Sequence, residues 1–568
     1  MNVIIPMTGY GSRFLAAGYK DLKPFIKIMD KPIIEWIVKG MYPSDVHFIF
    51  VCRGEHLEAD PGMRDRLFAL APEAAILSLE TWVKKGPVYY VLRAYRMLCN
   101  ASDGQDEVAD GEITGTPNIN TEDGFIINYC DFYMTWDYIA FAKEVKERDC
   151  DGAIPCYTDF HPHLLPEKNY YASCLTDEQD YLIEIREKYS FEKDKTKAKH
   201  SPGTYYFKNG DTMEKYCGIL TEHEECAING EYYASLPYNF MVRDGLKVWV
   251  PANVEYFCQW GTPEDMQEFV YWTDLIAKAG NKENTTSETK TVSRQAADGS
   301  AVNGKILIPM AGAGQRFADA GYRVHKPAIM TVDRKTGQEK PMVVCATADL
   351  PDVAPNGSNV IYVDRTFHKT DGVEDVIHSY YPKADFITVD HLTEGQACTC
   401  MLAEDRLDPE KPLLIAGCDN GMDIDRAAFD ELTKDCDCIV FTYRHNDAVL
   451  ANPNAYGWML TDEAGNITGT SIKKAISDTP MEDPAVVATF WFKKAKVFLE
   501  ATKKMIAEND RVNGEFYVDQ VAKHVLDLGY RAKIFDIDRY VGWGTPADYE
   551  NYQKTWKYFQ DFIKAEAL

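Results

Sequence analysis

The chain is 568 residues long, which at roughly 150 residues per domain predicts two to four domains. It carries 61 Lys and Arg against 88 Asp and Glu, a formal net charge of −27. This balance argues against nucleic acid as the main partner, because binding to a phosphate backbone requires clustered cations. Hydrophobic residues at 45% and aromatic residues at 12% exclude a chain that is disordered throughout.

Targeting and membrane segments are not visible in the sequence. Residues 1–6 (MNVIIP) lack the basic and long apolar regions of a secretory signal, and no stretch approaches the about 20 apolar residues of a membrane span. The 15 cysteines are scattered, and none stands at zinc-binding spacing with a histidine, so we expect reduced, mostly buried thiols. These features predict a soluble cytoplasmic protein without a membrane partner.

Apolar strands alternate with helices along the chain. The expected strands are 3–5, 47–52, 125–129, 306–308, 359–363, 412–416 and 438–442, and the clearest helices are 87–99, 494–508, 518–528 and 554–562. This alternation predicts an α/β fold with mostly parallel, doubly wound sheets. Ligands bind such sheets beyond the carboxyl ends of the strands, where a glycine-rich loop follows the first strand of each half.

Three motifs occur twice in the same order. Residues 3–27 (VIIPMTGYGSRFLAAGYKDLKPFIK) match residues 306–330 (ILIPMAGAGQRFADAGYRVHKPAIM). Two shorter matches pair Asn229-Gly-Glu-Tyr-Tyr with Asn513-Gly-Glu-Phe-Tyr, and Trp260-Gly-Thr-Pro with Trp543-Gly-Thr-Pro. The offsets of 303 (312 − 9), 284 (513 − 229) and 283 (543 − 260) positions drift slowly, which indicates a tandem duplication.

The boundary between the two copies is visible in the composition. Residues 280–303 are rich in Asn, Thr, Ser, Gly and charge and contain almost no large apolar side chains, so we expect a flexible linker. This gives a first domain at 1–279 and a second at 304–568. Residues 101–118 are polar and rich in glycine, and we expect them to form a loop inserted in the first copy alone.

Each copy carries a glycine loop and two cations after its first strand. The residues are Gly9, Gly11, Arg13 and Lys23 in the first copy, and Gly312, Gly314, Arg316 and Lys326 in the second. Glycines let the backbone approach a ligand and point N–H groups at phosphate oxygens, and the cations bind the same oxygens. The loop is neither a Walker A loop nor a G-x-G-x-x-G fingerprint, but its repetition with both cations predicts a phosphate site.

Each copy resembles the sugar-nucleotide pyrophosphorylases, nucleotidyltransferases of Rossmann-type, GT-A-like fold that join an NTP to a sugar 1-phosphate. The resemblance rests on the G-x-G-x-R-F…K-P opening and covers roughly residues 1–275 and 304–568. It is nearest to capsule and surface-polysaccharide members that open with I-P-M-A-G and close with G-T-P-E-D. It implies two tandem nucleotidyltransferase domains, an NTP and a sugar or polyol phosphate as substrates, an NDP-sugar and pyrophosphate as products, and Mg²⁺ as cofactor.

The resemblance also implies roles for residues that match the family's motifs. Arg13, Arg316, Lys23 and Lys326 would bind the NTP phosphates, Lys188 and Lys473 the sugar phosphate, Gly203, Glu231 and Glu515 the sugar, Asp131 and Asp419 the metal ion, and Gly395 and Gln396 the nucleobase and substrate. The first copy has Lys85-Gly86-Pro87 in place of the Gly-Gln loop, and the second has Ala488 in place of the glycine. The two sites are therefore expected to differ, and we slightly favour chemistry in the second.

The implied reaction is in-line attack by a phosphate oxygen of the sugar phosphate on the α-phosphorus of the NTP. No general base is required because the attacking phosphate is already anionic, so the protein has to position the substrates and offset negative charge. One departure stands out: Gln259 and Gly542 occupy the positions of the family's second metal-binding aspartate. Asp137 and Asp423 could substitute, although an exposed carboxylate without a ligand role is the simpler interpretation of each.

Two other functions are compatible with the sequence. A non-catalytic nucleotide-sugar sensor would tolerate loss of the second aspartate in both copies. A glycosyltransferase on the related GT-A scaffold is disfavoured, because the nearest D-x-D triplet, Asp423-Ile-Asp425, follows Asp419 too closely. The structural alternatives are arginines that staple a loop, tryptophans of the closing motif that pack in the core, and glutamates that accept turn hydrogen bonds. A homo-oligomer is compatible with the sequence, which names no partner protein.

Overall fold

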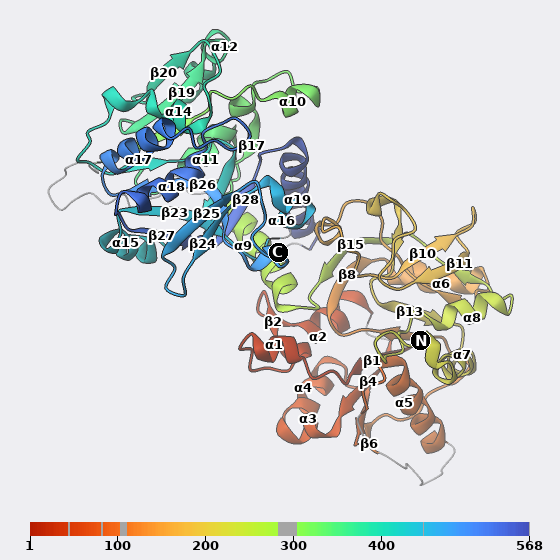
Figure 1. The fold of residues 1–568 in the computed structure, drawn as a ribbon. Helices are drawn as coiled ribbons and strands as arrows, with labels where there is room; N and C mark the ends of the chain where they lie inside the picture. The colour runs from red at the N-terminus through yellow and green to blue at the C-terminus, as the bar shows by residue number, and fades with distance from the viewer. Residues whose placement is uncertain (44–45, 81–82, 103–110, 282–303, 447, 567–568) are drawn as a thin grey trace. The chain divides into compact units, whose positions relative to one another are not determined.

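The computed structural model describes residues 1–568 except 44–45, 81–82, 103–110, 282–303, 447 and 567–568. Its chain divides into two compact units (Figure 1). Unit 1 comprises Met1–Asp274 and Tyr558–Leu568, and unit 2 comprises Leu275–Lys557. Residues 280–281 end helix α9 (Pro263–Asn281), and the rest of the predicted linker 280–303 lies outside the described residues. The predicted domain borders therefore stay a prediction.

Unit 1 is built on an eight-stranded sheet in the order β14-β9-β13-β7-β1-β4-β5-β6. The strands are β1 (Asn2–Met7), β4 (His47–Arg53), β5 (Ala75–Leu79), β6 (Gly111–Gly115), β7 (Phe125–Asn128), β9 (Gly152–Ala153), β13 (Thr204–Phe207) and β14 (Val248–Trp249). β1 pairs in parallel with β4 on one side and with β7 on the other. The winding direction therefore changes between β1 and β7, and such a switch point opens a crevice for ligands at the carboxyl ends of the strands.

Unit 2 repeats this arrangement in a nine-stranded sheet whose main order is β20-β19-β16-β21-β26-β23-β27. The strands are β16 (Lys305–Pro309), β19 (Val360–Arg365), β20 (Asp385–Val389), β21 (Leu413–Ile415), β23 (Cys438–Tyr443), β24 (Gly457–Thr461), β25 (Ile467–Ile472), β26 (Ala485–Phe492) and β27 (Ala532–Asp536). β16 lies between β19 and β21, parallel to both, so the switch point falls between β16 and β21. The predicted α/β class with mostly parallel, doubly wound sheets is confirmed.

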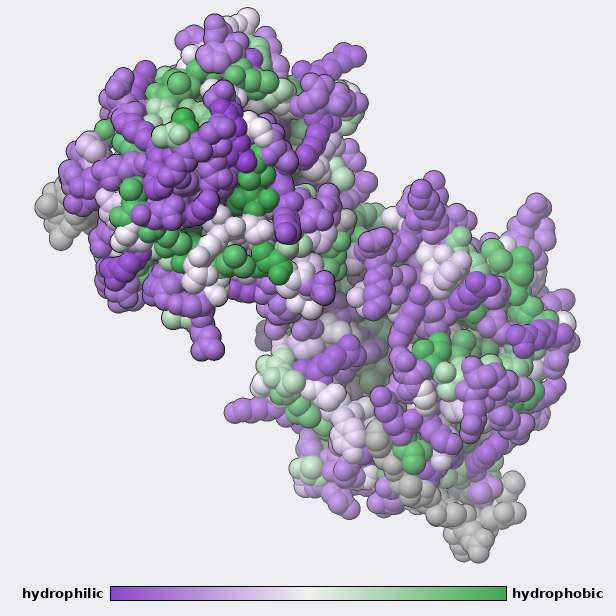
Figure 2. Space-filling model, in the orientation of Figure 1, coloured by the Kyte–Doolittle hydropathy of each residue, from purple (hydrophilic) through white to green (hydrophobic). Residues whose placement is uncertain are grey.

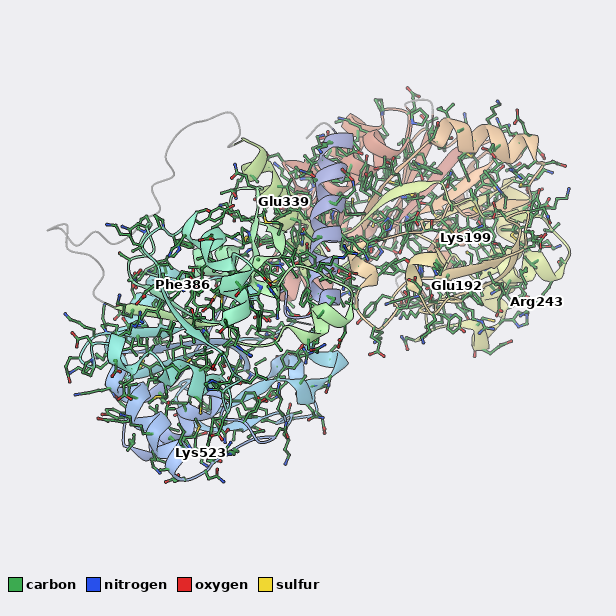
Figure 3. The ribbon with its side chains drawn as sticks, turned by 90° about the horizontal axis from the view of Figure 1, so that it is seen from above. Glu192, Lys199, Arg243, Glu339, Phe386 and Lys523 are labelled. Atoms are coloured by element: carbon green, nitrogen blue, oxygen red, sulfur yellow. The ribbon has the colours of Figure 1, made fainter. Side chains whose placement is uncertain are left out.

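Alternating side chains of the unit 2 sheet enter two separate cores. Leu307 packs in one core, and its neighbours Ile306 and Ile308 pack in the other, as the two-residue period of a strand requires. Helices α14 (Gln396–Met401), α17 (Ala495–Ala507) and α18 (Val518–Asp527) cover the first face, and α11 (Met342–Asp349), α13 (Val373–His378) and α15 (Arg426–Asp435) cover the second. Phe386 of β20, labelled in Figure 3, packs against the second core.

The surface in Figure 2 is mostly hydrophilic, with smaller hydrophobic areas. No described helix is long and apolar enough to cross a membrane. All 15 cysteines are free, and each is buried or partly buried, as expected of reduced thiols.

Most predicted elements are confirmed to within about two residues of their ends. Helix α5 (Pro87–Ser102) runs three residues past the predicted 87–99, and the C-terminal helix α19 (Pro546–Ala565) begins eight residues before the predicted 554–562. The predicted loop at 101–118 is wrong in part, because residues 111–115 form the edge strand β6, antiparallel to β5. An edge strand needs few apolar residues, and Ile113 alone of this segment packs against the core. Residues 103–110 lie outside the described part of the chain.

Candidate functional site

The glycine loops bend tightly over Lys23 in unit 1 and over Lys326 in unit 2. Gly11 and Gly314 both have φ +63° and stand just before the short helices α1 (Ser12–Ala16) and α10 (Gln315–Asp319). A Cβ at Gly11 would lie 3.5 Å from Cβ of Lys23, and one at Gly314 would lie 3.6 Å from Cβ of Lys326. The left-handed backbone explains why glycine is needed at these two positions.

The other members of the loops face open space. A Cβ at Gly9 or Gly312 would meet nothing within 4 Å, so packing does not require glycine at these positions. Arg13 and Arg316 are exposed, and the structure shows no hydrogen bond or ion pair for either guanidinium among the described residues. The interpretation of these arginines as loop staples therefore finds no support in the described contacts.

In unit 1 the loop lysine bridges two motifs that are distant in the sequence. Lys23 Nζ donates to Asp131 Oδ2 at 2.8 Å and to the carbonyl oxygen of Gly261 at 3.0 Å. Asp131 lies three residues after the end of β7, and its carbonyl accepts a hydrogen bond from the Trp260 backbone N–H at 3.0 Å. The glycine loop, the aspartate and the closing motif thus meet at one point beside the switch between β1 and β7.

Unit 2 contains the same arrangement. Lys326 Nζ donates to the Asp419 carboxylate and, at 3.0 Å, to the carbonyl oxygen of Gly544. The Trp543 backbone N–H donates to the Asp419 carbonyl at 2.9 Å. Burial opposes the charge on Lys326, but the neighbouring Asp419 outweighs this effect and the pKa of Lys326 is raised. Trp543 is 1% exposed, which confirms the prediction of a core role.

The proposed substitutes for the missing second aspartate have structural partners instead. Asp137 caps helix α6 (Tyr138–Glu147), since its side chain accepts a hydrogen bond from the Ala140 N–H at 2.8 Å. Asp423 pairs with Arg334, whose Nη1 lies 3.0 Å from Asp423 Oδ2. These contacts give both carboxylates structural roles in the fold.

A further carboxylate, Asp265, lies beside Gln259 and was not predicted as a site residue from the sequence. Asp265, in the closing Trp-Gly-Thr-Pro-Glu-Asp motif, accepts hydrogen bonds from the Gln259 side chain and, at 2.7 Å, from Thr262 Oγ1. Burial raises the pKa of Asp265. Burial also raises the pKa of Tyr171, and the charges of Asp265 and Asp131 add to this effect, so both carboxylates act on one hydroxyl. The repetition of the motif's aspartate as Asp548 was the signal that could have revealed it.

The Asn-Gly-Glu motif of each unit forms a tight turn. This turn packs against the Lys85-Gly86-Pro87 loop in unit 1 and against the Gly395-Gln396 loop in unit 2. Gly86 in unit 1 and Gly395 in unit 2 have positive φ, and an added Cβ would lie 2.7 Å from the Tyr232 nitrogen and 2.6 Å from the Phe516 nitrogen, respectively. Backbone hydrogen bonds join the two segments, from Tyr232 to Lys85 and from Phe516 to Glu394, each at 2.9 Å.

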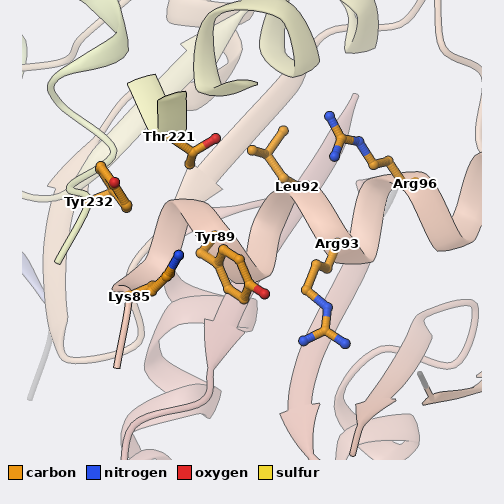
Figure 4. Close-up of a pocket in the computed structure, with 7 residues that line it drawn as sticks. All are labelled: Lys85, Tyr89, Leu92, Arg93, Arg96, Thr221 and Tyr232. Carbon is orange, nitrogen blue, oxygen red and sulfur yellow. The ribbon is translucent and has the colours of Figure 1, made fainter. Parts of the chain in front are cut away.

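This contact brings the predicted sugar ligands beside the predicted substrate loop in both units. Glu231 and Glu515 are one residue before the packed positions, and Gln396 is the first residue of α14. The unit 1 loop therefore occupies the same place as the Gly395-Gln396 loop despite its different sequence. A small pocket next to it is lined by Lys85, Tyr89, Leu92, Arg93, Arg96, Thr221 and Tyr232 (Figure 4).

The predicted sugar-phosphate lysines share an unusual backbone. Lys188 has φ +53° and Lys473 has φ +58°, which is the left-handed region for both. Their Nζ atoms lie 5.8 Å from the ring centres of Tyr233 and Tyr517, which follow the two Asn-Gly-Glu motifs. Burial raises the pKa of Tyr233 to about 12, with Glu231 and Glu187 adding to this effect and Arg13 acting against it.

Each of these lysines has a partly buried carboxylate beside it, supplied from a different position in each unit. In unit 1 the carboxylate is Glu187, which accepts a hydrogen bond from Ser235, and burial raises its pKa. In unit 2 the residue before Lys473 is Ile472, and Asp519 stands where the 284-residue offset (519 − 235) places Ser235. The sequence comparison missed this exchange because the two carboxylates do not align.

The third predicted sugar residue differs between the units as expected. Gly203 has φ +114°, and a Cβ there would lie 3.0 Å from both Tyr129 and Phe132. Ala488, its counterpart in unit 2, keeps a left-handed φ of +59° within β26. The backbone bend is thus retained although the glycine is not.

The pH dependence of unit 2 stability should report on Asp519. Burial raises the pKa of Asp519 to about 6, and Lys473 partly offsets this effect, whereas an unfolded aspartate titrates near about 3.9. Because the folded state binds the proton more tightly, this group's contribution to stability falls as pH rises from about 4 to about 6 and is constant above that range. Asp519→Asn should flatten this part of the curve in urea unfolding measured between pH 4 and 7. The exposed Asp405→Asn control should keep the wild-type profile, and an unchanged slope in Asp519→Asn would contradict the assignment.

Comparisons with known proteins were made on the whole chain. No protein-family model and no curated protein sequence matches it. Solved structures do match, among them a nucleoside-diphosphate-sugar pyrophosphorylase from Vibrio cholerae RC9, with 18% identity over 44% of this chain and 99% of that one at a TM-score of 0.36. The inositol-1-phosphate CTP transferase from T. maritima matches with 15% identity over 47% of this chain and 98% of that one at a TM-score of 0.34. A UDP-glucose pyrophosphorylase complexed with UDP-glucose matches with 17% identity over 46% and 99% of the two chains at a TM-score of 0.33.

Proposed function

We propose that the protein is a sugar-phosphate nucleotidyltransferase that joins an NTP to a sugar or polyol phosphate, for the synthesis of a surface or capsular glycan. The observation that carries the proposal is a cluster that occurs in both units: a left-handed glycine loop, a lysine paired with an aspartate, and the closing Gly-Thr-Pro motif. Cations and backbone N–H groups gathered at a switch point suit a substrate rich in phosphate. The same repetition supports an origin by tandem duplication.

The proposed roles in nucleotidyl transfer are as follows. Arg13 and Lys23, or Arg316 and Lys326, hold the NTP phosphates, while Lys188 or Lys473 holds the phosphate of the acceptor. An oxygen of the acceptor phosphate attacks the α-phosphorus, a new phosphorus–oxygen bond forms, and the bond to the β-phosphate oxygen breaks to release pyrophosphate. The cations stabilise the charge that develops on the leaving group, which is the main catalytic requirement of such a reaction.

The donor set beside each lysine fits a magnesium ion. Asp131 and Asp419 are 36% and 31% exposed in their side chains, so their carboxylates are accessible from solvent. Gly261 and Gly544 leave room beside them, since an added Cβ would lie 3.8 Å and 3.5 Å from the respective Oδ2 atoms. Mg²⁺ commonly binds proteins through one or two carboxylates and completes its shell with phosphates and water. When bound there, the ion would offset charge on the substrate phosphates.

The experiment that tests the proposal is pyrophosphate release with Mg²⁺ across a panel of NTPs and sugar or polyol phosphates. We expect release with one pair of substrates and none when either is omitted. Consumption of a finished NDP-sugar without NTP turnover would instead indicate a glycosyltransferase.

The sensor function remains the second candidate because neither Gln259 nor Gly542 supplies a carboxylate at the expected position. If no pair turns over while nucleotides still raise the melting temperature, the transferase proposal fails and the sensor takes its place.

A further inference from the structure

A buried histidine in unit 2 lies among carboxylates away from the candidate site. His524 of α18 is 0% exposed, and its Nε2 lies 3.0 Å from Asp510 Oδ2. Asp510 also accepts hydrogen bonds from Gln520 Nε2 at 3.0 Å and from Lys523 Nζ at 2.8 Å, and Lys523 is labelled in Figure 3. A carboxylate with these donors around it is an acceptor, so Nε2 of His524 carries the proton.

The other ring nitrogen has no hydrogen-bond partner. Nδ1 of His524 is buried and points between two carboxylates, with Glu508 Oε2 at 3.6 Å and Asp527 Oδ2 at 3.8 Å. In the neutral ring this nitrogen presents a lone pair toward two carboxylates, an arrangement that a metal ion bound by all three groups would stabilise. Among the described residues, this is the one group of three or more His, Cys, Asp or Glu side chains with ligand atoms close enough to share a metal ion.

We propose that His524, Glu508 and Asp527 bind a divalent transition metal ion, with Zn²⁺ as the best fit. A tetrahedral ion about 2.1 Å from its ligands separates neighbouring ligand atoms by about 3.4 Å, close to the 3.6 and 3.8 Å observed. One imidazole with two carboxylates suits Zn²⁺, and water completes the fourth position. The Asp510 contact fixes the tautomer and orientation of the ring, as outer-sphere carboxylates do for metal-binding histidines.

The ion would tie together the two ends of the segment that carries the Asn513-Gly-Glu turn. Glu508 directly follows α17, while His524 and Asp527 lie one turn apart near the end of α18. The segment between them holds Glu515, so the site would stabilise the fold around the predicted sugar ligand without touching substrate.

A lysine competes for the same carboxylates. Lys504 Nζ pairs with Glu508 and lies 3.6 Å from Asp527 Oδ2. Its side chain is 26% exposed, so it can swing into solvent when an ion binds. Removing this lysine should therefore tighten metal binding, because both carboxylates become available to the ion.

Unit 1 lacks the site at the corresponding positions. The 284-residue offset places Phe240 at position 524 (524 − 284) and Arg243 at position 527 (527 − 284), and both α8 (Pro237–Arg243) and α18 precede a glycine of positive φ, Gly245 or Gly529. Binding is therefore expected at one Zn²⁺ per chain.

The test is titration of the full chain, freed of metal by chelator and without a histidine tag, with Zn²⁺ by calorimetry and with Co²⁺ by visible absorption. We expect one site, a tetrahedral Co²⁺ spectrum and a Zn²⁺-dependent rise in melting temperature. Glu508→Gln and Asp527→Asn should each weaken binding more than about tenfold, Asp510→Asn should weaken it about 10–100-fold, and Lys504→Gln should strengthen it.

The matched control is Glu410→Gln, which alters an exposed carboxylate between Lys494 and Lys496 that has no histidine beside it. This variant should bind Zn²⁺ like the wild type. Affinity that is the same in wild type, Glu508→Gln and Asp527→Asn would overturn the proposal, as would a His524 ring that stays protonated on both nitrogens in excess Zn²⁺. The circular dichroism spectrum of each variant is compared with that of the wild type, so that weaker Zn²⁺ binding is not mistaken for unfolding.

Discussion

Replacing Lys326 by alanine is expected to lower the rate of pyrophosphate release by about 10²–10³-fold, the loss typical when one charge-stabilising donor is removed from an active site. Lys326 holds the Asp419 carboxylate and the Gly544 carbonyl together, so its loss removes the proposed phosphate ligand and the Lys326 partner of that carboxylate. The measurement is kcat and KM for the substrate pair identified in the panel.

Lys23→Ala is the matched change in unit 1. Comparing the two variants shows which unit carries the reaction. If unit 2 carries the reaction, Lys23→Ala should retain most of the rate, and the reverse pattern would place the reaction in unit 1. Lys199→Ala is the control, because Lys199 forms a part-buried ion pair with Asp180 at 2.5 Å outside the candidate site. Retention of activity by both Lys326→Ala and Lys23→Ala would exclude the lysine–aspartate clusters as catalytic sites.

Arg334→Met should lower the free energy of unfolding of unit 2 by about 3–5 kcal/mol, because the buried Asp349 carboxylate then keeps only the half-exposed Lys335 as a cationic partner. The Arg334 side chain is 2% exposed, and its Nη2 donates to Asp349 Oδ2 at 2.6 Å and to the Met422 carbonyl at 2.9 Å. Asp349 is itself 5% exposed. The measurement is the urea midpoint and slope of wild type and variant.

Arg426→Met provides the matched control, since Arg426 also contacts two aspartates, Asp352 and Asp430, but is 36% exposed. Its loss should cost less than about 1 kcal/mol, as for other solvent-exposed ion pairs. Equal destabilisation by the two variants would show that burial does not set the strength of the Arg334 network. The double variant Arg334→Met, Asp349→Leu should recover part of the loss, because it removes both buried charges together.

The repeated motifs were sufficient to predict the first strand, the glycine loop and the lysine of each unit. The strands and the left-handed glycines are confirmed, because a buried parallel strand and a left-handed glycine leave strong local signals in the sequence. The meeting of Asp131 with Lys23 could also be expected, since both follow strands that lie side by side at a switch point.

Side-chain contacts between residues that are distant in the sequence could not be predicted from the sequence alone. Asp423 was a possible but less favoured metal ligand in the sequence, which did not reveal its ion pair with Arg334, 89 residues away. The place of Asp265 was not predictable either, because it depends on a side-chain hydrogen bond from Gln259. Glu187 lies beside Lys188 in unit 1, and Asp519 lies beside Lys473 in unit 2. This correspondence could be found only from the structure, because the two carboxylates come from segments that do not align.

Lys188 and Lys473 both have a left-handed backbone, although lysine is not the residue that folding stability would favour in this conformation. Glycine or asparagine adopts this conformation more readily than lysine, so stability alone would favour either of them at both positions. A long cationic side chain is nevertheless found at both left-handed positions. These two positions therefore hold conformational strain of the kind that is associated with binding sites, and the polypeptide could discard both lysines and still reach the same fold.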